Sequence, residues 1–235
     1  MDGAEVEQAP RNVLETLVAE AASEGLTGNG CHAHVSVWDL EGKINACAGK
    51  GAGQIGVVGL SERGGHFPGG IMNHAEALAA LTNPTVNSDK RINAPRPLSR
   101  ATGAPNTVTW TGNNRTPMVR VPAPGRFELR LPDGAVNPYL LQAVIIDAGL
   151  SGIRSRADPG PRHDNDMYVE GNMLKTAPRP PLNTLDAVRA FDADTELKAM
   201  PGDAFSASCV KMQHREWNSF VSHFSQWEKD QTLDI

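Results

Sequence analysis

Two short segments of the sequence alternate strictly between apolar and polar side chains, and this alternation constrains the fold more than any other feature. In one segment the apolar positions are Cys31, Ala33, Val35 and Val37, and the polar parity holds His32, His34, Ser36 and Trp38. In the other, Phe127, Leu129 and Leu131 alternate with Arg126, Glu128 and Arg130. Because successive side chains of a β-strand point to opposite faces, each segment predicts a strand with one apolar and one polar face.

Hydrophobic periodicity and turn signals predict the other elements. Helices are expected over 11–25, over 60–81 with an interruption at Gly69-Gly70, from Asn137-Pro138 to 150, and over 183–191, 194–200 and from about 203 onward. Two further strands are expected at 107–110 and 117–121. In the last helix, Val210, Trp217, Val221 and Phe224 form an apolar stripe that we assign to the core.

Composition excludes several classes of protein. The 235 residues include 40% hydrophobic and 21% charged residues, a balance that allows a buried core. A net charge of −5 argues against a dedicated nucleic-acid binder, and no apolar run is long enough to span a membrane. The first ten residues are acidic and lack the apolar segment of a secretory signal. Three cysteines are too few for a disulfide framework, so a cytoplasmic location is expected.

The charge is unevenly distributed along the chain. Residues 90–130 contain eight basic side chains, seven of them arginine, and a single acid, Glu128. Arginine forms forked hydrogen bonds to carboxylate and phosphate groups, so this stretch fits a pocket for small anions. Charge alone is also compatible with a basic surface loop whose acids lie elsewhere in space.

The polar faces of the two alternating strands carry the groups that could perform chemistry. A His-x-His pair is a modest metal signal, and a glutamate between two arginines is also found in surface charge ladders. Together the patterns are more specific, because imidazole and carboxylate suit a divalent ion and arginines suit the anions it would bridge. Phosphoryl transfer requires phosphate groups to be positioned and their charge to be neutralised, and a metal ion beside several arginines can do both.

Several motifs, in order, resemble the carboxy-terminal half of the catalytic domain of glutamine synthetase. They are Gly28-Asn-Gly-Cys-His-Ala-His-Val-Ser, Asn83-Pro-Thr-Val-Asn-Ser-Asp-Lys-Arg, Asn113-Asn-Arg-Thr-Pro-Met-Val-Arg, Arg126-Phe-Glu-Leu-Arg-Leu-Pro-Asp and Asn137-Pro-Tyr. In its details the sequence is most similar to the type III branch of the family, which also resembles enzymes that make other γ-glutamyl amides. The resemblance covers about residues 26–235, whereas residues 1–25 do not match or form a remnant helix. It implies an α+β fold: an incomplete catalytic domain with a mostly antiparallel sheet, an open half-barrel, and helices on its outer side.

The resemblance also implies a function and a set of site residues. Such ligases use ATP to phosphorylate the γ-carboxylate of glutamate, and ammonia then displaces phosphate, with Mg²⁺ or Mn²⁺ as the metal. By position, His32 and Glu128 match metal ligands, and Gly28, Arg91, Arg115 and Arg130 match substrate-binding residues, with Arg115 also catalytic. His34, Ser36, Arg115, Arg120 and Arg126 match positions that contact ATP.

The chain departs from the family pattern at four positions. The asparagine before Gly28 is Thr27, the tyrosine before Lys90-Arg91 is Asp89, and a lysine before Glu128 is Ala123. Asp89 is expected to lie beside Arg91 and to weaken its hold on a carboxylate. The flap glutamate, which guards the intermediate and helps to take ammonium, is Gly103.

The amino-terminal domain of these ligases, and the first catalytic strands with their metal-binding glutamates, have no counterpart in the sequence. Two protein ligands are few for Mg²⁺, which prefers octahedral, oxygen-rich coordination. We therefore expect the chain to be inactive alone, as a fragment or as one half of a split enzyme whose partner chain supplies the rest. The alternatives are a non-catalytic or regulatory subunit that retains nucleotide or oligomer contacts, and a γ-glutamyl alkylamide ligase. Full-length relatives form homo-oligomers, and no nucleic-acid or membrane partner is expected.

Overall fold

The computed structural model describes residues 29–49, 58–92 and 103–232. The expected helix over 11–25 and the candidate residue Gly28 lie outside this part. The strands are β1 (Ala33–Val35), β2 (Trp110–Thr111), β3 (Val119–Ala123) and β4 (Arg126–Leu129). The helices are α2 (Glu62–Asn73), α3 (Ala75–Thr82), α4 (Val86–Ile92), α5 (Pro138–Ser155), α6 (Met167–Glu170), the 3₁₀ turn η2 (Gly171–Met173), α7 (Thr184–Ala193), α8 (Thr195–Ala199), α9 (Asp203–Val221) and α10 (Gln226–Thr232).

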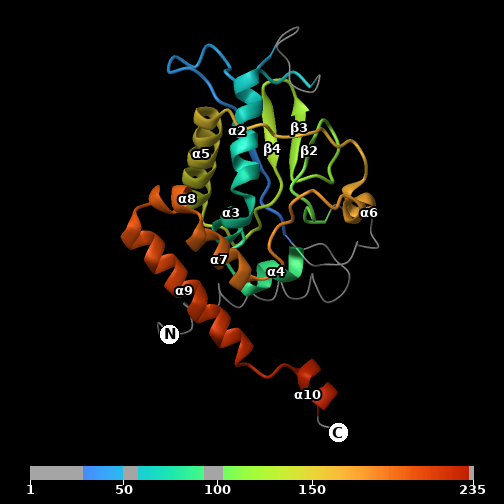
Figure 1. Cartoon of the computed structure of the whole chain (residues 1–235), viewed down its shortest axis with the longest axis vertical. Coiled ribbons are helices and arrows are strands. Elements are labelled where there is room, and N and C mark those ends of the chain that lie inside the picture. Colours follow the sequence, from blue (N-terminus) through green and yellow to red (C-terminus); the bar gives the residue numbers. More distant parts are fainter. Residues whose placement is uncertain (1–28, 50–57, 93–102, 233–235) are drawn as a thin grey trace, which may run out of the picture.

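The four strands form one mixed sheet in the order β1-β4-β3-β2. β4 pairs antiparallel with both β1 and β3, and the short edge strand β2 runs parallel to β3. The predicted α+β class is therefore confirmed, and the expected mostly antiparallel sheet has one parallel pairing at its β2 edge. Figure 1 shows α2 and α5 packed side by side along this sheet.

The alternating strands place their apolar parity against these helices. Phe127 and Leu129 are fully buried, and the ring of Phe127 lies 5.7 Å from that of Phe67 on α2. On β1 the exposure alternates as predicted, with Ala33 and Val35 partly covered while His32 and His34 are exposed. The polar parity therefore faces away from the helical layer, and the candidate site lies on that side.

The predicted interruption of the second helix at Gly69-Gly70 is wrong. α2 passes through both glycines and ends at His74, which also begins α3. A Cβ on Gly70 would overlap the backbone carbonyl of Ala148 on α5, so the glycine pair allows the two helix backbones to cross closely. This packing requirement outweighs the low helix propensity of glycine.

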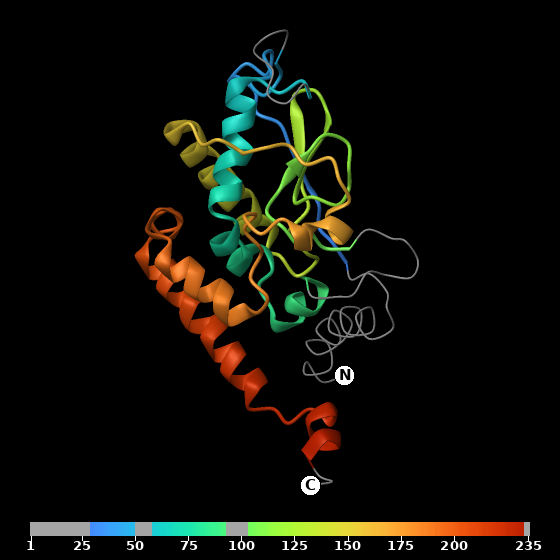
Figure 2. The same ribbon diagram turned by 45° about the vertical axis from the view of Figure 1, so that its right-hand side comes forward.

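The starts of the other predicted helices agree well with the structure, although α5 continues to Ser155, beyond its predicted end at residue 150. Asn137 caps α5 by accepting hydrogen bonds from Tyr139 N and Leu140 N, with Pro138 in the first turn, as the sequence predicts. The prediction of the carboxy-terminal stripe as core is wrong in its second half: Val221 and Phe224 are more than half exposed. Figures 1 and 2 show α9 extending past α7 and carrying α10 away from the rest of the fold.

Candidate functional site

The strand register brings the predicted metal and phosphate residues together around Glu128. Glu128 on β4 lies opposite His34 on β1 and opposite Arg120 on β3. His32 and Arg130 stand two residues along their chains from these partners and therefore occupy the same face. The cluster thus follows from the period-two pattern together with the order β1-β4-β3.

The side chains converge closely on the Glu128 carboxylate. His32 Nδ1 lies 3.0 Å from Glu128 Oε1, and Arg130 Nη1 lies 3.3 Å from the same oxygen. Arg120 Nε is 2.6 Å from Glu128 Oε2, and His34 Nε2 is 4.0 Å from Oε1. The predicted shared position of His32 and Glu128 is therefore present in the structure, with two guanidinium groups around it.

Several polar atoms of this cluster are buried without a hydrogen-bond partner in the described part of the chain. They are Glu128 Oε2, Arg120 Nε, and Nε and Nη2 of Arg130. Arg120 and Glu128 form a close ion pair, but their atoms are not aligned for a hydrogen bond. Because unpaired buried polar atoms are costly, these atoms mark a place where a polar ligand would be stabilising.

The electrostatic environment keeps His32 neutral at physiological pH. The His32 side chain is 31% exposed, and this partial burial together with the Arg130 guanidinium lowers the pKa of His32 to about 4, against the opposing effect of Glu128. A neutral imidazole beside a carboxylate is a donor set that suits a divalent transition-metal ion or Mg²⁺. In the described ranges, however, no group of three or more His, Cys, Asp or Glu side chains could hold a metal, so His32 and Glu128 fit as a partial ligand set.

Arg91 reaches the same region from α4. Its Nη1 donates to Leu131 O at 2.8 Å and its Nη2 donates to Arg130 O at 3.3 Å. A Cβ on Gly30 would lie 2.9 Å from Arg91 Nη2 and 3.0 Å from His32 Nε2, so a larger residue there would require the Arg91 guanidinium to shift. The structure therefore brings Arg91 and Arg130, the two predicted carboxylate-binding arginines, next to the metal candidates.

Three other predicted residues lie farther from the cluster. Ser36 is exposed and accepts a hydrogen bond from Trp38 Nε1 at 2.9 Å. Arg126 is exposed at the start of β4, and Arg115 is exposed in the loop before β3. Neither arginine forms an ion pair with the Glu128 cluster in the part of the chain that the structure describes.

The expectation that the Asp89 carboxylate lies beside the Arg91 guanidinium is wrong. Asp89 Oδ2 instead accepts hydrogen bonds from both N and Oγ1 of Thr184, each 2.8 Å long, at the start of α7. Burial raises the pKa of Asp89 to about 6. The carboxylate is therefore directed away from the guanidinium group two residues later.

The sequence analysis missed Tyr168 on α6. Its hydroxyl donates to Gly103 O at 2.6 Å, and burial raises its pKa while Arg130 and Arg91 lower it. The phenol therefore lies near Arg130 and Arg91, the two predicted carboxylate-binding arginines, and contacts the position where the resemblance places a flap glutamate. It belongs to a proline-rich stretch without periodicity, so no sequence signal pointed to it.

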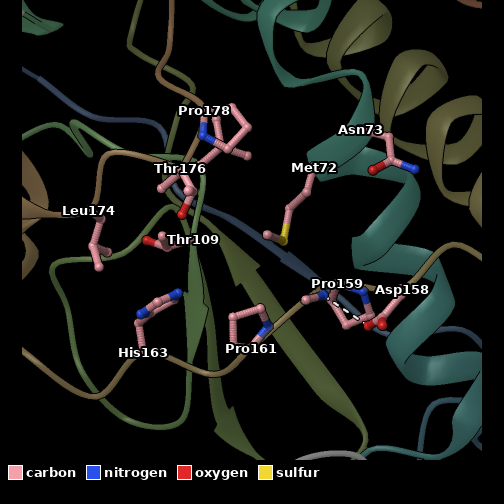
Figure 3. Close-up of a pocket in the computed structure, with 13 residues that line it drawn as sticks. Met72, Asn73, Thr109, Asp158, Pro159, Pro161, His163, Leu174, Thr176 and Pro178 are labelled. Atoms are coloured by element: carbon pink, nitrogen blue, oxygen red, sulfur yellow. Dashed lines mark hydrogen bonds between the residues drawn. The ribbon is translucent and has the colours of Figure 1, made fainter.

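A pocket of about 240 Å³ lies elsewhere, between the end of α2 and the loops around 158–163 and 174–178. Figure 3 shows Met72 on one side of it and Thr109, His163 and Thr176 on the other. None of the predicted site residues lines this pocket. The hydroxyl of Thr109 is hydrogen-bonded to that of Thr107, and Asp158 accepts a hydrogen bond from Gly160 N. Because these polar groups already have partners, we assign the pocket no chemistry.

Comparisons with known proteins agree with this geometry. The family described as "Glutamine synthetase, catalytic domain" matches residues 7–232. A glutamine synthetase of Rhizobium leguminosarum bv. phaseoli is 68% identical over 212 residues, which cover 90% of this chain and 48% of the relative. A glutamate–methylamine ligase of Methyloversatilis universalis is 37% identical over 214 residues, covering 88% of this chain and 46% of the relative.

Solved structures give the same result. One described as a GmaS/ADP complex is 52% identical and superposes with a TM-score of 0.82, covering 89% of this chain and 47% of that chain. The chain thus spans about half the length of the relatives that it matches.

Proposed function

Because the chain belongs to the glutamine synthetase family, we propose that it forms part of an ATP-dependent ligase that joins ammonia or a small amine to glutamate. The observation that carries this proposal is the convergence of His32, Arg120 and Arg130 on Glu128. A carboxylate, an imidazole and guanidinium groups on one sheet face are what two anionic substrates and a divalent ion require.

The reaction has two steps. An oxygen of the glutamate γ-carboxylate attacks the γ-phosphorus of ATP, and ADP leaves with the electrons of the broken P–O bond. The amine nitrogen then attacks the acyl carbon of the γ-glutamyl phosphate, inorganic phosphate leaves, and the nitrogen loses a proton. Both steps need anions to be held together and charge to be neutralised, which positioned arginines provide.

We assign the residues to these tasks by their places in the cluster. Arg130 and Arg91 would bind carboxylates of glutamate, which agrees with the unpaired Nε and Nη2 donors of the buried Arg130. Arg120, with the exposed Arg115 and Arg126, would bind the triphosphate. His34 and Ser36, on the same face of β1, would contact the nucleotide.

His32 and Glu128 would hold a divalent ion, Mg²⁺ or Mn²⁺. The neutral imidazole and Glu128 Oε2, which accepts no hydrogen bond although it lies in an ion pair with Arg120, fit such an ion. When bound, it would act as a Lewis acid that neutralises phosphate charge. Because the described residues supply only these two ligands, we propose that turnover needs further ligands from outside them, supplied by the same polypeptide or by a partner chain.

The nucleophile is the least constrained part of the proposal. Relatives include a glutamate–methylamine ligase, which supports a small amine as an alternative to ammonia. The segment at Gly103 offers no carboxylate at that position, and its backbone is bonded to Tyr168 instead. A comparison of ammonia, methylamine and hydroxylamine as acceptors would separate a glutamine synthetase from a γ-glutamyl alkylamide ligase.

Cellular context follows the family expectation. No helix in the described ranges is long and apolar enough to cross a membrane. We propose a cytoplasmic protein that works as a homo-oligomer, and a non-catalytic subunit that retains nucleotide binding is the main alternative.

Two measurements test the proposal. The first is calorimetric titration of the chain with ADP in the presence of Mn²⁺, for the native protein, for Arg120→Gln and for the control Arg154→Gln on the exposed side of α5. Binding that Arg120→Gln weakens and Arg154→Gln preserves supports the assignment, and no heat at millimolar nucleotide contradicts it. The second is γ-glutamyl hydroxamate formation from glutamate, ATP and hydroxylamine. Nucleotide binding without turnover by the chain alone is the result expected for an incomplete site.

A further inference from the structure

The helix that carries Arg91 cannot be stable by itself. α4 has seven residues, and isolated helices shorter than about 12–15 residues are marginal in water. Only Ser88, Arg91 and Ile92 are buried, so its hydrophobic anchoring is small. Polar contacts with its neighbours, α7 and α9 among them, therefore contribute strongly to its position.

The first of these contacts is made by Asp89. Its Oδ2 accepts two hydrogen bonds from Thr184, one from the backbone N and one from Oγ1. Thr184 is only 1% exposed, so a water molecule could not easily replace Asp89 as the acceptor for the two Thr184 donors. α7 also has its own cap in Asn183, which accepts from Asp186 N, so α7 does not depend on Asp89 alone.

The second contact is made by Glu216 on α9. Its Oε1 accepts a hydrogen bond from Val86 N, the first residue of α4, at 3.0 Å. α9 is itself fixed to α3, because Gln213 Nε2 donates to Ala80 O. Burial is the main cause of the raised pKa of Asp89, and Glu216 lies near enough to add to it, so the two carboxylates that hold α4 lie close to each other.

We propose that Asp89 and Glu216 are positioning residues that hold α4 so that the Arg91 guanidinium reaches Leu131 O and Arg130 O beside the candidate site. The proposed importance of that position rests on the proposed function, in which Arg91 binds a substrate carboxylate. The residue that departs from the family motif, Asp89, would thus support Arg91 rather than weaken it. Neither carboxylate touches substrate; both act through the placement of α4.

The test is the rate at which phenylglyoxal modifies individual arginines, measured by peptide mass spectrometry on the full chain without ligand. Arg91 is 6% exposed and should react slowly in the native protein, whereas the exposed Arg154 serves as the fast reference. The equally buried Arg130, on the sheet, reports global loosening. The variants are Asp89→Ala, Asp89→Asn and Glu216→Ala, with Asn183→Ala as the control that weakens the start of α7 without touching α4.

We expect Asp89→Ala to speed modification of Arg91 about tenfold, the order expected when two hydrogen bonds to a carboxylate are lost. Glu216→Ala should speed it less, and Asp89→Asn, which keeps an acceptor, should restore slow modification. Arg130 should stay protected in all three variants. If Asp89→Ala does not fold, Thr184→Val, which removes one of the two donors, replaces it with the same expected direction.

Two results would overturn the inference: an unchanged Arg91 rate in folded Asp89→Ala, or an equal increase in Asn183→Ala. The outcome is independent of the proposed function, because no ligand is present. Addition of glutamate and ADP to the native chain tests that function separately, through protection of Arg91 and Arg130.

Discussion

Replacement of Glu128 by glutamine removes the carboxylate on which Arg120, Arg130 and His32 converge in the described part of the chain. The Glu128 side chain is 4% exposed and balances Arg130, which is 2% exposed, and Arg120, which is 11% exposed. Loss of one partner of a buried ion pair costs about 3–5 kcal/mol. Glutamine keeps one carbonyl oxygen for Arg130, so we take the lower end, about 3 kcal/mol of unfolding free energy. For a chain of this size that corresponds to a melting temperature lower by about 10 °C.

The assay is urea denaturation and thermal unfolding followed by circular dichroism. Glu41→Gln is the matched control, because Glu41 pairs with Lys43 at 2.7 Å while both side chains are largely exposed. That variant should change the unfolding free energy by less than about 0.5 kcal/mol. Arg120→Gln added to Glu128→Gln should recover part of the loss, since it removes one of the uncompensated charges. If the free energy of unfolding of Glu128→Gln lies within about 1 kcal/mol of the native value, Glu128 does not act as a buried counter-charge.

Three further perturbations test other parts of the fold. Burial raises the pKa of Asp89 to about 6. The contribution of Asp89 to the free energy of unfolding is therefore largest below the ordinary pKa of an aspartate and is lost as the pH rises through about 6. Because the group is partly exposed, Asp89→Asn should remove this slope and gain about 1 kcal/mol at pH 8 in urea titrations; an unchanged slope contradicts this. His74→Ala should cost about 2 kcal/mol in the same titrations, since His74 Nδ1 contacts Asp194 Oδ2 at 2.5 Å. A loss below about 0.5 kcal/mol would show that this contact is unimportant. Gly70→Ala should lower the free energy of unfolding by about 2–3 kcal/mol through overpacking against Ala148, with a clearly lower melting temperature. An unaltered melting curve would show that α2 and α5 adapt freely.

Much of the site could be predicted from the sequence because β-strands have a strict period of two. The alternation in 31–38 and 126–131 correctly placed His32, His34 and Glu128 on polar faces and Phe127 and Leu129 in the core. The strand order, which brings these faces together, is given by the structure, since the resemblance predicted only a mostly antiparallel sheet. The close pairing of Arg120 with Glu128 depends on the β3–β4 register, which alternation alone does not determine.

The failures have a common physical cause, which is that tertiary packing overrides local preference. Gly69-Gly70 was predicted to interrupt a helix, but close contact with α5 requires glycine inside α2. Asp89 was predicted to oppose Arg91, but helix geometry directs it to the start of α7. Val221 and Phe224 follow a helical stripe, yet α9 extends beyond the helices that could bury them.

The proposed function depends on a single divalent ion held by both His32 and Glu128. It is tested most directly by titrating Mn²⁺ into the chain and following paramagnetic broadening of histidine ring signals by NMR. The account predicts that His32 broadens first and His34 next, while His66 and His74, which contact Ala157 O and Asp194 on the helical side, stay sharp. Glu128→Gln should shift this selective broadening to higher Mn²⁺ concentrations. Uniform broadening of all histidine signals, or a sharp His32 signal at millimolar Mn²⁺, would show that His32 and Glu128 do not hold a common ion.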